Sequence, residues 1–153
     1  MNTDKIEKQI ELKASVGRVW RALTDFVEFG AWFRVKLDGP FVAGSTVKGR
    51  ITHPGYEHVT WAITIERMEP ERLLSWRWHP YAIDPKADYS AEEPTLVVFE
   101  LKPAGAGTEL TVVESGFDRV PLARRALAYR MNGDGWTQQM KSIEKHVSAP
   151  VQA

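Results

Sequence analysis

Residues 121–147 read PLARRALAYRMNGDGWTQQMKSIEKHV and carry the strongest periodic pattern in the chain. Apolar and small residues recur there at alternating steps of four and three, which places them on one face of an α-helix. Pro121 suits the first turn of that helix, where its missing N–H is not needed. We therefore predict one long C-terminal helix. Its apolar stripe consists of Leu122, Ala126, Tyr129, Gly133, Trp136, Met140, Ile143 and Val147.

The segments before this helix have the pattern of strands. Residues 5–13 alternate polar side chains with Ile6, Ile10 and Leu12, as a half-buried strand does. Two short helices are predicted next, one after an N-cap at Ser15 and one after Asp25. Short turn signals separate most of the later runs, which favours an antiparallel meander. We predict an α+β fold formed by residues 1–153 as a single domain. The later strands are expected at residues 45–52, 58–68, 72–78, 95–102 and 109–117.

Composition limits the classes of function. The chain of 153 residues has 20 Lys plus Arg and 20 Asp plus Glu, so no net field attracts it to nucleic acid or anionic lipid. It has no cysteine, which excludes a disulfide framework and a thiolate nucleophile. A charged N-terminus and the lack of a long apolar run predict a cytoplasmic protein without membrane insertion. Six Trp, six Phe and four Tyr must either fill a core or line a cavity.

The order of elements resembles that of the helix-grip domains, the START-like or SRPBCC superfamily. Particular motifs are similar to the branch related to the heat-shock chaperone ATPase activator. One departure is Ala14-Ser15-Val16-Gly17, where a proline usually precedes the first helix, and this affects the helix start more than the function. The motifs are Val19-Trp20-Arg21-Ala22-Leu23-Thr24, Trp32, Gly107-Thr108-Glu109-Leu110-Thr111, Gly116-Phe117 and Gly135-Trp136.

The resemblance implies a helix-grip fold, in which a curved antiparallel sheet wraps around the long C-terminal helix and encloses a cavity for apolar molecules. The leading hypothesis is a non-catalytic carrier or sensor of a small hydrophobic ligand such as a lipid, sterol, polyketide or aromatic compound, with no cofactor. One alternative is an enzyme of the polyketide cyclase or aromatase type. Another is a chaperone-associated interaction module, and either a monomer or a homodimer is compatible with the sequence.

The predicted pocket wall is the set of large apolar residues from the second short helix, the strands and the long helix. Gly133 omits volume between two aromatic residues, so a neighbouring ring or a ligand must fill the gap. Simple core packing is the competing interpretation for each residue. The set is Phe29, Trp32, Phe33, Trp61, Trp76, Trp78, Phe99, Phe117, Gly133, Trp136 and Met140.

Polar candidates for proton transfer are His79, Arg77 and Glu114, and the wider polar set adds Arg50 and Asp118. Strand alternation favours an outward Glu114, and an inward position would require hydrogen-bonding or cationic partners. Arg77 must face opposite to Trp76 and Trp78 in a regular strand.

The remaining motifs do not indicate a metal or phosphate site. His53 and His58 have no third ligand at suitable spacing, so a metal site is not predicted. Gly105-Ala106-Gly107 lies in a hairpin turn and precedes a strand, unlike a phosphate-binding loop. The long polar connection over residues 79–94 contains three prolines, and we expect it to border the pocket mouth.

Overall fold

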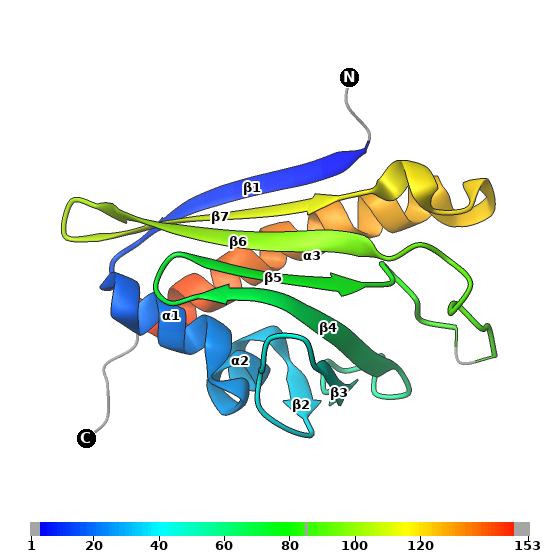
Figure 1. Ribbon diagram of the computed structural model, residues 1–153, viewed down its shortest axis with the longest axis horizontal. Coiled ribbons are helices and arrows are strands. Elements are labelled where there is room, and N and C mark those ends of the chain that lie inside the picture. The colour runs from blue at the N-terminus through cyan, green and yellow to red at the C-terminus, as the bar shows by residue number, and fades with distance from the viewer. Residues whose placement is uncertain (1–3, 85, 149–153) are drawn as a thin grey trace.

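The computed structural model describes residues 4–84 and 86–148 and confirms the helix-grip architecture (Figure 1). Seven antiparallel strands form one curved sheet in the order β1-β7-β6-β5-β4-β3-β2. The long helix α3 runs along one face of this sheet, and α1 and α2 lie near one end of it. The elements are β1 Lys5–Leu12, α1 Val16–Thr24, α2 Phe26–Phe33, β2 Val35–Leu37, β3 Thr46–Ile51, β4 Thr60–Glu69, β5 Leu73–Trp78, β6 Thr95–Ala104, β7 Gly107–Ser115, the 3₁₀ turn η1 Phe117–Arg119, and α3 Leu122–Ser148.

The two short helices begin at side-chain caps, and the cap at Ser15 was predicted. Ser15 Oγ accepts a hydrogen bond from Arg18 N at 3.2 Å and starts α1. The Asp25 carboxylate accepts from the backbone N–H groups of Val27 and Glu28, so it ends α1 and starts α2. These caps fix the direction of α2, which buries Phe29, Trp32 and Phe33 against the sheet.

The strands lie in the predicted segments, with two differences. The three-residue strand β2 was not predicted, because so short an alternation cannot be distinguished from a loop. The last strand ends at Ser115 and not at Phe117, because Gly116 adopts a left-handed φ of 100° and Phe117 begins η1. Strand β4 buries alternate residues, namely Trp61, Ile63 and Ile65, whereas β5 buries four consecutive residues from Leu73 to Trp76.

Helix α3 confirms the predicted length, but the predicted stripe is wrong in its first turns. Leu122 is 81% exposed and Ala126 is also exposed, because this end of the helix extends past the sheet (Figure 1). From the middle of the helix onward the stripe is buried, at Trp136, Met140, Ile143 and Val147. The sheet and the two short helices therefore cover the C-terminal half of α3 more completely than its start.

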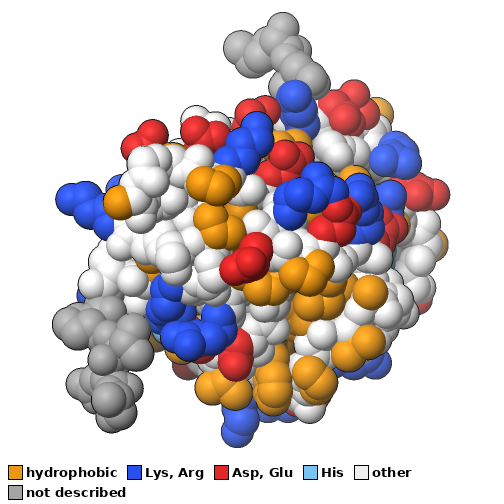
Figure 2. All heavy atoms as spheres, turned by 60° about the vertical axis from the view of Figure 1, so that its left-hand side comes forward, with side chains coloured by type: hydrophobic (Ala, Val, Ile, Leu, Met, Phe, Trp, Pro, Cys, Tyr) orange, Lys and Arg blue, Asp and Glu red, His pale blue; other side chains and the backbone are white. Residues whose placement is uncertain are grey.

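The surface carries charges of both signs. Figure 2 shows positive and negative side chains interspersed over one face of the molecule, with hydrophobic side chains gathered in the lower half of that view. Of the helices within residues 4–84 and 86–148, none is long and apolar enough to cross a membrane.

Candidate functional site

Glu114 is the most deeply buried charged residue of the sheet, with no exposed surface. Its Oε2 accepts hydrogen bonds from Trp78 Nε1 at 2.7 Å and Thr95 Oγ1 at 2.5 Å. Its Oε1 accepts from Trp136 Nε1 at 2.8 Å and Asn132 Nδ2 at 2.9 Å. Indole N–H groups can only donate, so this site is arranged around a carboxylate acceptor. One side chain thereby fixes two tryptophan rings and one carboxamide.

The inward position of Glu114 corrects the sequence-based expectation that it faces solvent. On β7 the buried residues are Thr108, Leu110, Val112 and Glu114, so Glu114 lies in step with the apolar side of its strand. That parity was visible in the sequence. The four donors to Glu114 were not visible in the sequence, because they come from β5, β6 and α3. Only these partners make burial of the carboxylate tolerable.

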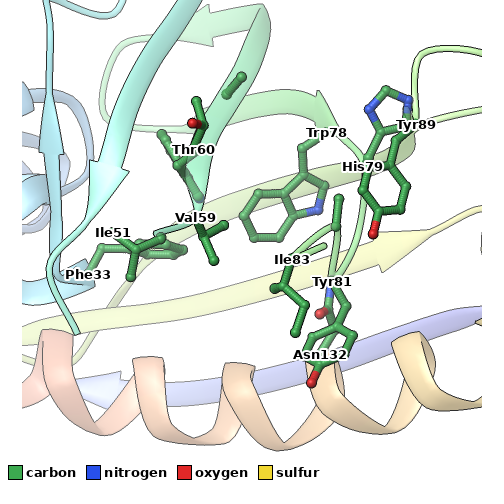
Figure 3. Close-up of a pocket in the computed structure, with 13 residues that line it drawn as sticks. Phe33, Ile51, Val59, Thr60, Trp78, His79, Tyr81, Ile83, Tyr89 and Asn132 are labelled. Carbon is green, nitrogen blue, oxygen red and sulfur yellow. The ribbon is translucent and has the colours of Figure 1, made fainter. Parts of the chain in front are cut away.

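A cavity of about 340 Å³ opens beside these residues. Phe33 from α2, Trp61 from β4 and Trp78 from β5 form its apolar wall, and Asn132 from α3 borders it on one side. Figure 3 shows Phe33, Ile51 and Val59 on one side of Trp78, while Tyr81 and Ile83 reach toward Asn132. This volume lies at the lower end of the range for small-molecule sites. The other lining residues are Ile51, Val59, Thr60, Ala62, His79, Tyr81, Ala82, Ile83 and Tyr89.

A smaller cavity of about 80 Å³ adjoins the first and shares Phe33, Trp78 and Asn132 with it. Its remaining lining residues are Gly135, Trp136 and Gln139. Asn132, Gly135, Trp136 and Gln139 are spaced i, i+3, i+4 and i+7, so they form one face of α3. Apart from its chain neighbours and the backbone of its own helix turn, a Cβ at Gly135 would have no heavy atom within 4 Å. The glycine therefore leaves open space in this second cavity.

Four residues of the predicted pocket wall border these cavities, namely Phe33, Trp61, Trp78 and Trp136. Their rings lie in mutual contact, with centroid separations between 5.4 and 6.2 Å. The other buried members of the predicted set pack against one another or the rest of the core and border neither cavity. They are Phe29, Trp32, Trp76, Phe99, Phe117 and Met140.

Gly133 lies on a different face of α3 from the cavities. A Cβ there would sit 4.0 Å from Ile6 Cδ1 of β1, so the missing volume is next to the sheet. Gly135, two residues later, is the glycine that borders a cavity. Sequence reasoning selected Gly133 because it belongs to the apolar stripe, whereas the cavity face of α3 carries the polar residues Asn132 and Gln139.

The polar candidates separate into different environments. Arg77 confirms the strand argument, since it points away from both tryptophans and its Nε bonds Glu66 Oε1 at 2.6 Å. His79 borders the larger cavity, and its Nε2 lies 3.0 Å from the carbonyl oxygen of Glu92. Because a carbonyl only accepts, this nitrogen carries the proton. Arg50 and Asp118 are exposed and line neither cavity.

The connection over residues 79–94 borders the cavity, as expected, and Arg124 of α3 holds it in place. The guanidinium forms hydrogen bonds to both carboxylate oxygens of Glu92 and to the carbonyl oxygen of Pro80 at 2.6 Å. It also lies over the Tyr89 ring, 4.8 Å from the centroid. Tyr81 has a φ of 50°, which is uncommon for a large side chain and directs the chain at the cavity mouth.

Comparison with known proteins agrees with this architecture. A family model described as Activator of Hsp90 ATPase homolog 1-like protein matches residues 13–148. No curated protein sequence matched the chain.

Three solved structures are similar in fold. DynU16, a protein of the dynemicin biosynthetic locus, is 22% identical with a TM-score of 0.72 over 95% of this chain; this chain spans 48% of its length. Protein MLL2253 from Mesorhizobium loti is 22% identical with a TM-score of 0.76, covering 97% of this chain and 99% of that one. The Aha1 dimer from Colwellia psychrerythraea is 18% identical with a TM-score of 0.70, covering 94% and 95%. At these identities the likeness concerns the fold alone.

Proposed function

The chain belongs to the Activator of Hsp90 ATPase homolog 1-like family, and from that premise we propose that it binds a small hydrophobic molecule as a non-catalytic carrier or sensor. The observation that carries this proposal is the aromatic cavity of about 340 Å³ between the sheet, α2 and α3. Its walls combine large apolar rings with a few polar groups, which is the usual composition of small-molecule sites. Burial of ligand surface against these rings supplies the affinity, at roughly 25 cal/mol per Å² before ordering costs.

The test is a thermal-shift screen against fatty acids, sterols, flavonoids and aromatic polyketides. A ligand that binds only the folded state stabilises it by about 2.7 kcal/mol when present at 100 times its Kd. We expect a dose-dependent rise in Tm for at least one class. A protein that shows no rise with any class contradicts the proposal.

A cavity-filling variant assigns the binding to this site. Gly135→Leu projects a side chain into the smaller cavity, which shares Phe33, Trp78 and Asn132 with the larger one, and its Cβ meets no atom outside its own helix turn within 4 Å. It should abolish the ligand-dependent rise in Tm and preserve the fold. Gly133→Ala is the control, because it also replaces a glycine of α3 but faces Ile6 of β1. Ligand binding that survives Gly135→Leu unchanged would show that the ligand does not enter the smaller cavity.

The cyclase alternative is favoured by one observation, the position of His79 at the cavity. Its Nε2 donates to Glu92, which leaves Nδ1 of a neutral ring as the acceptor for a substrate proton. Any compound that raises Tm should therefore be incubated with the protein and examined by mass spectrometry. Conversion that is lost in His79→Gln supports an enzyme, and recovery of the unchanged compound supports a carrier.

A further inference from the structure

The carboxamide of Asn132 has a defined orientation. Its Nδ2 lies 2.9 and 3.2 Å from the two carboxylate oxygens of Glu114. This end must be the amide nitrogen, because an amide oxygen in its place would face the carboxylate oxygens as one acceptor against others. The nitrogen and oxygen of a carboxamide diverge from one carbon, and Oδ1 is therefore directed away from Glu114. No donor among residues 4–84 and 86–148 bonds this oxygen, and Asn132 borders both cavities. The site thus offers an oriented acceptor.

Among the described residues, the cavity walls offer no lysine or arginine to an anionic ligand. The Glu114 carboxylate behind the wall is held by indole, hydroxyl and amide groups and by no cation. The guanidinium of Arg124, on α3, lies over Tyr89 and is paired with Glu92. A ligand carboxylate would therefore lose its water without gaining a cation.

The walls favour a flat ring system. Phe33, Trp61, Trp78 and Trp136 line the two cavities with aromatic rings, and Tyr81 and Tyr89 add two more rings from the loop. Aromatic ligands gain from offset stacking and edge-to-face contacts with such rings beyond the area they bury. An unbranched acyl chain gains only the free energy of the apolar area that it buries.

Resting on the proposed function, we propose that the ligand is an uncharged aromatic molecule with a hydrogen-bond donor, such as a phenol or a heteroaromatic N–H, which it gives to Asn132 Oδ1. Glu114 acts as a positioning residue that fixes the carboxamide and disfavours anionic ligands. Fatty acids and aromatic carboxylates should accordingly bind more weakly than neutral aromatic molecules.

Three matched probes test this ligand class: 2-naphthol, naphthalene and 2-naphthoate. They share one ring system, and near pH 7 only 2-naphthoate is charged. Their Kd values are measured with the intact chain by ligand-observed NMR or quenching of tryptophan fluorescence. We expect 2-naphthol to bind roughly three- to tenfold more tightly than naphthalene, the contribution of one hydrogen bond. We expect 2-naphthoate to bind at least about tenfold more weakly than 2-naphthol.

Two variants assign these differences to residues. Asn132→Leu keeps a helix-forming side chain of similar size and should make 2-naphthol and naphthalene bind equally. Glu114→Gln should reduce the discrimination against 2-naphthoate. If Glu114→Gln does not fold, the wild-type series and Asn132→Leu still decide the question. A preference for 2-naphthol that persists in Asn132→Leu overturns the assigned acceptor.

The failures of the two proposals are distinguishable. If 2-naphthoate binds as tightly as 2-naphthol and Gly135→Leu removes both, the cavity binds ligands but the inferred class is wrong. If none of the three probes binds and the wider screen is also negative, the proposed function is wrong as well.

Discussion

The two ends of α3 lie in different surroundings. Near its C-terminal end, His146 Nε2 contacts Glu28 Oε1 of α2 at 2.9 Å, and the adjoining interior is filled by protein side chains. Phe29 there lies 4.9 Å from Trp32 and 5.6 Å from Trp76 by ring centroids. Toward its N-terminal end, Arg124 holds a loop, and the space beneath that loop is a cavity. The first region supplies stability, and the second leaves room for a ligand.

The largest expected difference between these regions comes from replacing an isoleucine by alanine in each of them. Ile65 is fully buried on β4 opposite Trp76, whereas Ile83 lies on the loop and borders the cavity. Ile65→Ala should lower the free energy of unfolding by about 2–5 kcal/mol, because it leaves a void among packed side chains. Ile83→Ala should cost less than about 1 kcal/mol. Urea denaturation measures both, and equal losses would show that the open region is packed as tightly as the closed one.

Glu114 lies where the two regions meet, and its removal should have the next largest effect. Glu114→Gln places an N–H against groups that are themselves donors, so the free energy of unfolding should fall by about 1–3 kcal/mol. Glu109→Gln is the matched control on the outward side of β7, where the expected change is near zero. Near-ultraviolet circular dichroism should also change for Glu114→Gln, because the glutamine keeps one acceptor oxygen and one of the two indoles therefore loses its hydrogen bond. If Glu114→Gln leaves the free energy of unfolding unchanged, the role assigned to this carboxylate is wrong.

The sequence predicts the closed region better than the open one. Alternation over residues 5–13 and the stripe on α3 encode apolar packing directly, and they identify the buried residues Ile6, Leu12, Ile143 and Val147. The cavity depends on residues without such a signal: Tyr81 and Ile83 lie in an aperiodic loop. Asn132 resembles a solvent-exposed helix residue until its partner Glu114 is placed nearby. Partners from distant strands decide this polar site, and one sequence does not give their distances.

Arg124 provides a test of how the open end is held. Arg124→Ala removes the bonds to Glu92 and Pro80, so the loop over residues 79–94 should open more often. Its amide hydrogens should exchange faster, and the free energy of unfolding should fall by about 1 kcal/mol. Arg125→Ala is the control, because Arg125 bonds the carbonyl oxygens of Val120 and Asp118 outside this loop. Equal exchange in both variants would show that Arg124 does not restrain the loop.

Substitutions of the two glycines of α3 allow the two regions to be compared on a single helix. Gly133→Ala and Gly135→Ala should each stabilise the protein by about 0.5–1 kcal/mol, because alanine favours the helix and both added methyl groups fit. Their effects on binding should differ, since only Gly135 borders a cavity. Titration with 2-naphthol should show weaker binding for Gly135→Ala and unchanged binding for Gly133→Ala. The reverse order would place the ligand beside β1.

The smallest expected effect lies at the closed end and depends on pH. Partial burial acts to raise the pKa of Glu28, but hydrogen bonds from His146 and Arg18 and the charges of Arg18 and Arg21 outweigh it and hold this pKa below 4.5. A carboxyl with a lowered folded-state pKa stabilises the protein above its unfolded-state pKa. That contribution is lost as the pH falls through the folded-state pKa.

Glu28→Gln should therefore lower the free energy of unfolding by roughly 0.5 kcal/mol near neutral pH. It should have almost no effect below the folded-state pKa of Glu28, where the wild-type carboxyl is also uncharged. Urea denaturation from about pH 6 downward measures the difference from wild type. Glu144→Gln is the control, because Glu144 is exposed on the same helix as His146. A difference that stays constant as the carboxyl titrates would mean that Glu28 contributes through packing and not through charge. The closed end would then owe its stability to apolar contacts alone, and Arg124 would remain the ionic contact that distinguishes the open end.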